Sequence, residues 1–200
     1  MSIEQSQSRG EILDRWFDRG CPSDVGIIGK LYPASYQTNH RYLNRQVEQG
    51  KLDVLGEVRG SNGRPKLIYG RKCKCDNLLH EFELSAVLVH LEAEGWEWCR
   101  GASVNPRFRA DAEIRRYGQV FRLELDRGTR RRHSLQEQLE RHAKSQDFVL
   151  YVVPSERRMR EVKELGENLR EQLLCTTFAK AAKDPFDEIW EDVYGHRTSL

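Results

Sequence analysis

The spacing of hydrophobic residues predicts that residues 1–50 are mainly helical. Helices are expected over 4–19, 24–32 and 36–49. The third has one apolar face, whose members recur at intervals of four, three and four residues: Tyr36, His40, Leu43 and Val47. Polar residues that favour helix ends support these limits, because a serine can cap a helix start and glycine can end one. These residues are Ser23, Ser35 and Gly50.

After Gly50, the spacing of hydrophobic residues changes to one that is typical of strands. "KLDVLGEVR" and "RPKLIYG" read as two strands, and the glycine-rich "GSNG" between them reads as a turn. Two helices followed by a hairpin with a basic tip resemble the winged helix-turn-helix domains of bacterial DNA-binding proteins. The blocks "LNRQVEQGKL" and "GRPKLIYG" carry this resemblance. It implies an N-terminal DNA-binding domain over residues 1–72.

In such a domain, the polar face of the third helix would contact DNA, and the wing would reach a backbone or a minor groove. Amides suit adenine, and arginine suits guanine or phosphate. The helix residues expected on this face are Gln37, Thr38, Asn39, Arg41, Asn44 and Arg45. The wing residues are Arg59, Asn62, Arg64 and Lys66. A solvated polar face without a partner is the alternative interpretation.

The second half of the chain, residues 78–200, reads as an α+β or α/β domain. A helix over 78–95 precedes three strands, "WEWCR", "FRADAEIRR" and "QVFRLELD". A helix follows them, and the continuous apolar run "FVLYVVP" is typical of a buried parallel strand. A charged helix, a short strand and a terminal helix or tail complete the domain, which has the order αβββαβ at its centre.

The register of the second and third strands follows from their sequences. If Tyr117-Gly118 is a two-residue loop, the apolar positions of both strands share one face. On the other face, Glu113 meets Arg122 and Arg109 meets Asp126, which are favourable pairs of opposite charge. Asp111 would then face Glu124. Two carboxylates in this arrangement require a shared proton, a cation or a metal, or they form a surface pair in which one pKa is raised.

This order of elements resembles the restriction-endonuclease-like core of the PD-(D/E)xK superfamily. The resemblance implies an Mg²⁺ site in which Asp111 and Glu124 are the ligands. Asp126 stands where the pattern has a lysine, and as a third catalytic candidate it would add a carboxylate. Gln138 and His142 loosely resemble the Q-x-x-x-Y of some branches.

A second resemblance covers residues 10–155. The blocks "LLHEFELSAVLV", "RADAEI", "FRLELDRGT" and "LQEQLERH", placed after a winged helix, resemble the replication-relaxation family of plasmid and mobile-element proteins. This implies DNA binding in replication, relaxation or mobilisation. The arginines of the following run would hold phosphate, or else lie in a solvated loop: Arg127, Arg130, Arg131 and Arg132.

Composition limits these interpretations. The 200 residues include 33 basic and 31 acidic side chains, so any nucleic-acid site must be a local patch within a net charge of +2. No apolar run reaches the roughly 18 residues that span a bilayer, and the start of the chain does not read as a signal peptide. Five cysteines without an export signal suggest reduced thiols and a cytoplasmic protein.

Three functional hypotheses result. The first is a sequence-specific protein of a plasmid or mobile element that binds double-stranded DNA and acts in replication, mobilisation or their regulation. The second is an Mg²⁺-dependent endonuclease that uses Asp111, Glu124 and Asp126. The third is a transcriptional repressor whose second domain forms a homodimer. Replication or mobilisation proteins are further expected partners.

Overall fold

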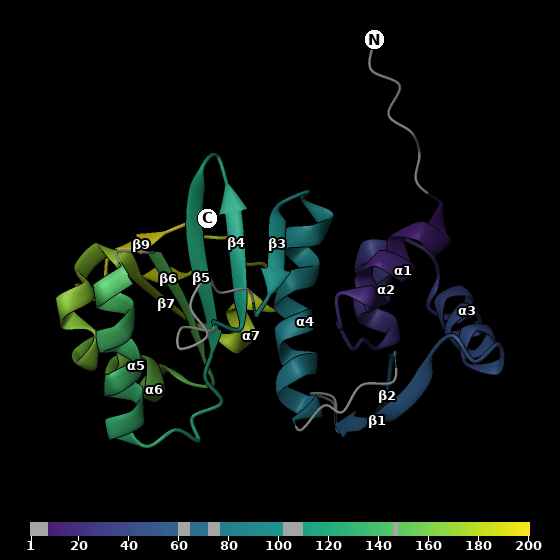
Figure 1. Cartoon of the computed structure of the whole chain (residues 1–200), viewed down its shortest axis with the longest axis horizontal. Helices are drawn as coiled ribbons and strands as arrows, with labels where there is room; N and C mark the ends of the chain where they lie inside the picture. Colours follow the sequence, from purple (N-terminus) through teal and green to yellow (C-terminus); the bar gives the residue numbers. More distant parts are fainter. Residues whose placement is uncertain (1–7, 60–64, 72–76, 102–109, 146–147) are drawn as a thin grey trace, which may run out of the picture. The chain divides into compact units, whose positions relative to one another are not determined.

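A computed structural model describes residues 8–59, 65–71, 77–101, 110–145 and 148–200. The chain forms two compact units, residues 1–89 and 90–200, and the division falls within helix α4 (Leu78–Ala93) (Figure 1). The linker predicted between residues 72 and 78 lies mostly outside the described residues, and the domain limits stay a prediction. No helix within the described ranges combines the length and apolar character needed to cross a lipid bilayer.

Unit 1 begins with the three predicted helices: α1 (Arg9–Asp18), α2 (Val25–Leu31) and α3 (Tyr36–Glu48). The start of α1 is fixed by a capping box. The Ser8 hydroxyl accepts from the Glu11 amide, and the Glu11 carboxylate accepts from the Ser8 amide. Ser35 caps α3 as predicted, and Gly50 follows its end with a positive φ of 68°.

The cap of α2 differs from the prediction. Asp24, rather than Ser23, caps this helix, because its Oδ1 accepts from the Ile27 amide at 2.8 Å. Ser23 is instead buried, and its backbone forms a bridge with Tyr69. Its hydroxyl accepts from the Trp16 indole at 2.7 Å, so this serine joins α1 to the second strand of the unit.

The predicted hairpin is confirmed in unit 1. Strands β1 (Asp53–Arg59) and β2 (Pro65–Gly70) pair antiparallel. The core of this unit contains fully buried side chains from the helices and from β2: Leu13, Trp16, Ile28, Leu43 and Ile68. The turn between the strands, with Asn62 and Arg64, lies outside the described residues.

Unit 2 is built on a seven-stranded mixed sheet in the order β3-β4-β5-β6-β7-β8-β9. Its strands are β3 (Glu97–Arg100), β4 (Ala112–Arg116), β5 (Gln119–Leu125), β6 (Phe148–Val153), β7 (Leu173–Thr177), β8 (Trp190–Glu191) and β9 (Arg197–Thr198). The helical segments between them are α5 (Arg132–Ser145), α6 (Glu156–Leu165), η1 (Glu167–Gln172) and α7 (Phe178–Ala181). The described residues are therefore mixed α and β, as predicted.

The register predicted for β4 and β5 is confirmed. Glu113 lies opposite Arg122, and Tyr117-Gly118 forms the loop with positive φ at both residues. The strand before the loop is shorter than predicted, because β4 begins only at Ala112. Asp111, predicted to face Glu124, therefore lies just outside the ladder, although the two carboxylates are close enough for their charges to interact.

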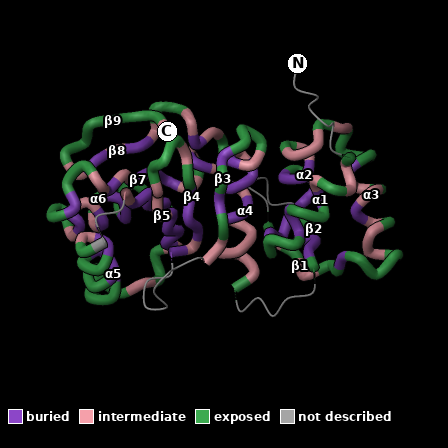
Figure 2. The backbone as a smooth tube through the Cα atoms, turned by 45° about the horizontal axis from the view of Figure 1, so that its top comes forward, coloured by how far each residue is buried: buried purple, intermediate pink, exposed green. Residues whose placement is uncertain are grey.

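Strand β6 runs parallel to β5, as its continuous apolar sequence predicts, and β7 runs parallel to β6. Helices α5 and α6 lie together on one side of the sheet (Figure 1). Their apolar residues form a core with alternate residues of β6 and β7, including Leu139, Met159, Tyr151 and Cys175. Figure 2 shows the resulting run of buried backbone through the central strands.

The last part of the chain forms strands where a terminal helix or tail was expected. Strand β8 pairs with β7 at Cys175 and Glu191, and β9 pairs with β8. Trp190 docks as predicted, since it is fully buried and its indole donates to the Pro185 carbonyl at 2.7 Å.

Candidate functional site

The polar residues of β5 lie beneath the helices of unit 2. Glu124 pairs in register with Tyr151 of β6, whose side chain belongs to the core under α5 and α6. Glu124 and Asp126 are each only 2% exposed. Their position at the carboxyl ends of parallel strands is where α/β proteins commonly bind ligands. The face that was expected to be polar is thus an enclosed site.

The Glu124 carboxylate contacts two basic side chains. Its Oε1 lies 3.0 Å from Nε2 of His142 on α5, and its Oε2 lies 3.9 Å from the Arg130 guanidinium. Burial raises the pKa of Glu124. The hydrogen bond with His142 opposes this effect, and the nearby Asp111 carboxylate adds to it.

Asp126 has a separate cation. The Arg158 Nε donates to Asp126 Oδ2 at 2.6 Å, and the Gly128 amide donates to Oδ1 at 2.9 Å. Arg158 also donates to the Arg130 carbonyl at 3.0 Å and to Glu161 at 2.7 Å. The partner predicted for Asp126, Arg109, lies outside the described residues. The sequence did predict an arginine for this carboxylate, but it did not indicate one from α6.

A third group joins the loop after β5 to α5 and β6. Arg130 and the Tyr151 hydroxyl both donate to Gln138 Oε1. The Tyr151 hydroxyl oxygen lies 2.8 Å from Gln138 Oε1. Burial raises the pKa of Tyr151, so its hydroxyl keeps its proton and acts as a donor. Gln138 and His142 therefore both contact residues of the site, whereas their match to the Q-x-x-x-Y pattern stays a prediction.

Asp111 has a backbone role. Its Oδ2 accepts from the Leu125 amide at 2.7 Å, so the carboxylate holds the end of β5 although it lies outside β4. Asp111 and Glu124 are near enough for their charges to interact. However, the oxygens of Asp111, Glu124 and Asp126 are directed at protein donors. Within the described residues, no group of three or more His, Cys, Asp or Glu side chains could hold a metal ion.

The residues present therefore do not fit the Mg²⁺ site that the superfamily resemblance implies. The lysine of the pattern is replaced by Asp126, which is bound by Arg158. The cation beside Glu124 comes from Arg130, whose side chain is 37% exposed. What the arrangement can do is neutralise two buried carboxylates and fix the loop between β5 and α5.

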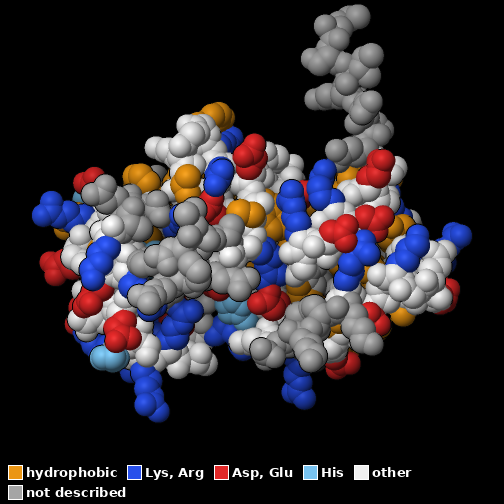
Figure 3. Space-filling view, viewed as in Figure 1, with side chains coloured by type: hydrophobic (Ala, Val, Ile, Leu, Met, Phe, Trp, Pro, Cys, Tyr) orange, Lys and Arg blue, Asp and Glu red, His pale blue; other side chains and the backbone are white. Residues whose placement is uncertain are grey.

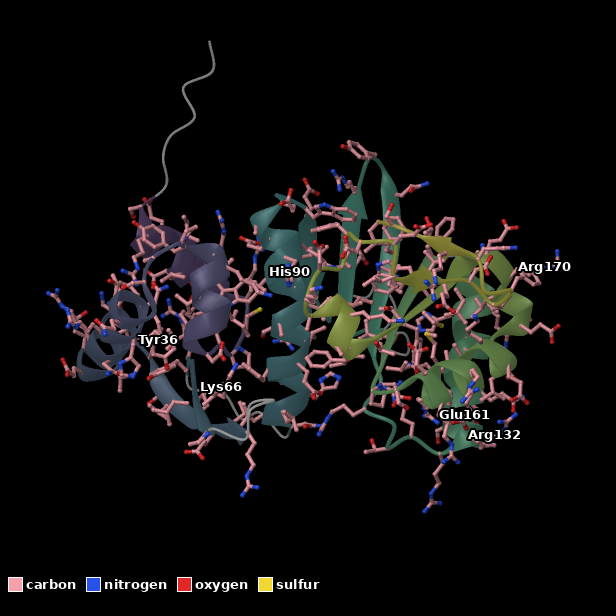
Figure 4. The ribbon with its side chains drawn as sticks, turned by 180° about the vertical axis from the view of Figure 1, so that it is seen from behind. Tyr36, Lys66, His90, Arg132, Glu161 and Arg170 are labelled. Carbon is pink, nitrogen blue, oxygen red and sulfur yellow. The ribbon has the colours of Figure 1, made fainter. Side chains whose placement is uncertain are left out.

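Arg130 and Arg132 of the arginine run are already engaged. Arg130 turns inward, as described, and Arg127 is half-buried. Arg132 pairs with Glu164 at 2.7 Å and lies 3.9 Å from Glu161, beside which it is labelled in Figure 4. Arg131 is exposed. The run is thus partly a set of structural cations, which explains why its sequence alone overstated the available basic surface.

The predicted DNA-facing residues of α3 divide into two groups. Gln37, Thr38, Arg41 and Arg45 are exposed, as expected. Asn39 is not, because only 1% of it is exposed and its Oδ1 accepts from Arg9 of α1 at 2.7 Å. The prediction that Asn39 faces outward is wrong, and this amide instead joins two helices.

Two further residues that were predicted to contact DNA, Asn44 and Lys66, are bonded to other residues of unit 1. Asn44 is half-buried and accepts from the Tyr69 hydroxyl at 3.2 Å. Lys66 is exposed on β2, but its ammonium pairs with Asp24 at 2.8 Å. Arg59 is exposed at the end of β1.

Tyr36 was assigned to the apolar face of α3, yet it is 69% exposed and stacks on His40 with ring centroids 6.0 Å apart. Its place as the first residue of α3 is the signal that could have indicated exposure. Tyr36 and Lys66 are both labelled in Figure 4 and border one hollow of unit 1, about 290 Å³ in volume.

Comparisons of the chain with protein-family models, with curated proteins and with solved structures gave no match.

Glu124→Gln should change how stability depends on pH. A carboxyl whose pKa is raised on folding binds its proton more tightly in the folded state. The free energy of unfolding therefore falls as pH rises from the ordinary glutamate value through the raised pKa. The variant should lack this fall, so its stability relative to wild type should be greater at neutral pH than at acidic pH. Urea titrations at several pH values measure the free energy of unfolding. The same dependence of this free energy on pH in both proteins would contradict the prediction.

Arg158→Met should destabilise unit 2 by about 3 kcal/mol, because it leaves the buried Asp126 carboxylate without its cation. The double variant Asp126→Asn with Arg158→Met should recover most of that loss, since it removes the uncompensated charge. Thermal and urea unfolding of the two variants provide the measurement. Arg157→Met, at the exposed neighbouring position, is the matched control. Equal losses in the single and double variants would argue against the charge explanation.

Proposed function

We propose that this chain is a DNA-binding protein in which unit 1 reads duplex DNA through α3. The observation that carries the proposal is the division of α3 into two faces. Gln37, Arg41 and Arg45 share the exposed face, whereas Asn39 and Leu43 are buried on the other. Arginine and glutamine are the side chains that read guanine and adenine in a major groove and that contact phosphate.

The order of elements in unit 1 supports a winged helix as the framework for this reading. Helix α2 packs against α3, and the β1–β2 hairpin follows directly. In a helix-turn-helix, the second helix enters the major groove. Arg59, at the end of β1, would then be a wing contact to the DNA backbone.

We further propose that unit 2 is a nuclease-like domain that does not cleave DNA. The strand and helix order supports this assignment. The engagement of Glu124 by His142 and of Asp126 by Arg158 supports the absence of turnover, because a carboxylate held by protein cations is a poor ligand for Mg²⁺. The exposed Arg131 offers unit 2 a phosphate contact.

The biological setting is proposed from the sequence blocks alone. Their resemblance to the replication-relaxation family supports a role in the replication or mobilisation of a plasmid or other mobile element.

The double variant Arg41→Ala with Arg45→Ala should weaken duplex binding by about 1 to 3 kcal/mol for each residue that contacts a base. Titration of the labelled DNA upstream of the gene, against random fragments of equal length, measures this at a fixed salt concentration. Arg71→Ala is the matched control. It removes one positive charge from unit 1, where the double variant removes two, and Arg71 already pairs with Asp18 at 2.7 Å. Wild-type affinity in the double variant, or no duplex binding by the intact protein, would refute the proposal.

Incubation with supercoiled plasmid in Mg²⁺ or Mn²⁺ should leave the plasmid intact. The reason is that at least one oxygen of each of Asp111, Glu124 and Asp126 is already hydrogen-bonded to a group of the protein. Gel electrophoresis of the plasmid after incubation is the measurement, and Asp111→Asn with Glu124→Gln is the control for contaminating nuclease. Nicking by the wild type that this control lacks would establish the endonuclease instead.

A further inference from the structure

The tip of the β4–β5 hairpin carries a residue that its own turn disfavours. Tyr117 has φ of 50° and Gly118 has φ of 79°, so both central positions are left-handed. Such turns favour asparagine or glycine, and a bulky residue there costs on the order of 1 kcal/mol. Tyr117 is 91% exposed, so burial of its ring does not offset this cost. Burial within unit 2 therefore does not account for a tyrosine at this position, although its ring and its hydroxyl contact the neighbouring Arg116.

The neighbouring arginine is held in a fixed orientation. The Arg116 guanidinium lies 4.2 Å from the centre of the Trp96 ring and 4.9 Å from that of Tyr117. Trp96 is itself anchored, since it is 6% exposed and packs on Phe186 at 5.4 Å. A guanidinium that stacks on rings keeps its N–H donors in its own plane, where they can still bind phosphate. The tip therefore presents an aromatic ring beside a cation that loses little freedom on binding.

A hollow of about 550 Å³ adjoins this tip within unit 2. One wall is the turn at 94–97 before β3, and the other is the end of the hairpin, residues 115–120. The hairpin projects from the sheet in Figure 1, and Figure 3 shows hydrophobic surface at its outer end. The volume falls within the range of small-ligand sites.

The charges of the hollow favour a base over a phosphate as its occupant. Glu94 and Glu97 line it together with Arg115 and Arg116, and the Arg115 guanidinium is already paired with Glu113 at 2.6 Å. Carboxylates would repel a phosphate, but they accept hydrogen bonds from the amino groups of bases such as cytosine. A base also offers a flat face to Tyr117.

We propose that Tyr117, Arg116 and the adjoining hollow form a binding site for an unpaired base of single-stranded DNA. Tyr117 stacks on the base, Arg116 contacts the adjacent phosphate, and Glu97 accepts from a base amino group. Stacking of this kind is tolerant of sequence because every base has a π-face. The site differs from the duplex-reading face of α3 in both its unit and its ligand, and it does not rest on the proposed function.

The test compares Tyr117→Asn with wild type. Asparagine suits the turn, so the variant should melt at the wild-type temperature or above. Its affinity for a labelled single strand of about 12 nucleotides should fall about tenfold in fluorescence anisotropy.

Tyr117→Trp should keep or increase the affinity, because it retains a stacking ring. Tyr194→Ala removes another exposed tyrosine of unit 2 and should leave binding unchanged. Oligo-dC should bind more tightly than oligo-dT, and Glu97→Ala should remove that preference, because it removes the acceptor.

A blunt duplex of the same length completes the experiment. Tyr117→Asn should bind this duplex as the wild type does, whereas the variant with Arg41→Ala and Arg45→Ala should lose duplex binding and keep single-strand binding. No single-strand binding by the wild type would overturn the site. Unchanged single-strand affinity in Tyr117→Asn, or equal losses for single strand and duplex, would overturn it as well.

Discussion

The enclosure of two carboxylates on one strand face is the constraint on which unit 2 depends. A charged carboxylate that leaves water must be compensated by hydrogen bonds and cations nearby. His142 and Arg130 contact the Glu124 carboxylate, and Arg158 pairs with the Asp126 carboxylate. These partners come from α5, from the loop before it and from α6. The helical layer is therefore joined to the sheet by polar contacts as well as by its apolar core.

This constraint also determines which arginines are available to bind a phosphate. Of the run after β5, Arg130 is directed inward and Arg132, although exposed, is paired with Glu164, so part of its charge is already engaged by the protein. A cluster of arginines in a sequence therefore does not measure basic surface when buried carboxylates stand close by. We proposed that α3 reads DNA and that the enclosed site of unit 2 does not cleave it. Both proposals agree with this distribution of charge.

Sequence reasoning succeeded where neighbouring residues decide the structure. The loop at Tyr117-Gly118 and the opposite charges of Glu113 and Arg122 were sufficient to set the register of a hairpin. The continuous apolar run was sufficient to indicate a parallel strand at 148–153. Both signals are local, and each is reinforced by the requirement that one strand face be buried.

The sequence failed where a polar group finds its partner far along the chain. Asn39 is bound by Arg9, thirty residues earlier, and Asp126 is bound by Arg158, thirty-two residues later. Periodicity indicates only which face of a helix is polar, and it cannot indicate that a buried cation has been brought there by another element. For the same reason, the pairing of Glu113 with its neighbour across the hairpin could be predicted, but the binding of Asp126 by Arg158 of α6 could not.

The last strands of the sheet have a consequence for synthesis of the chain. Strand β7 pairs with β6 on one side, and on its other side it pairs with β8 at Cys175 and Glu191. On the ribosome, the segment with Trp190 emerges only after β7 is complete. Until then one edge of the sheet has unpaired backbone groups, which is the state most prone to pairing with other nascent chains. Closure of that edge therefore depends on the segment that follows β7 along the chain.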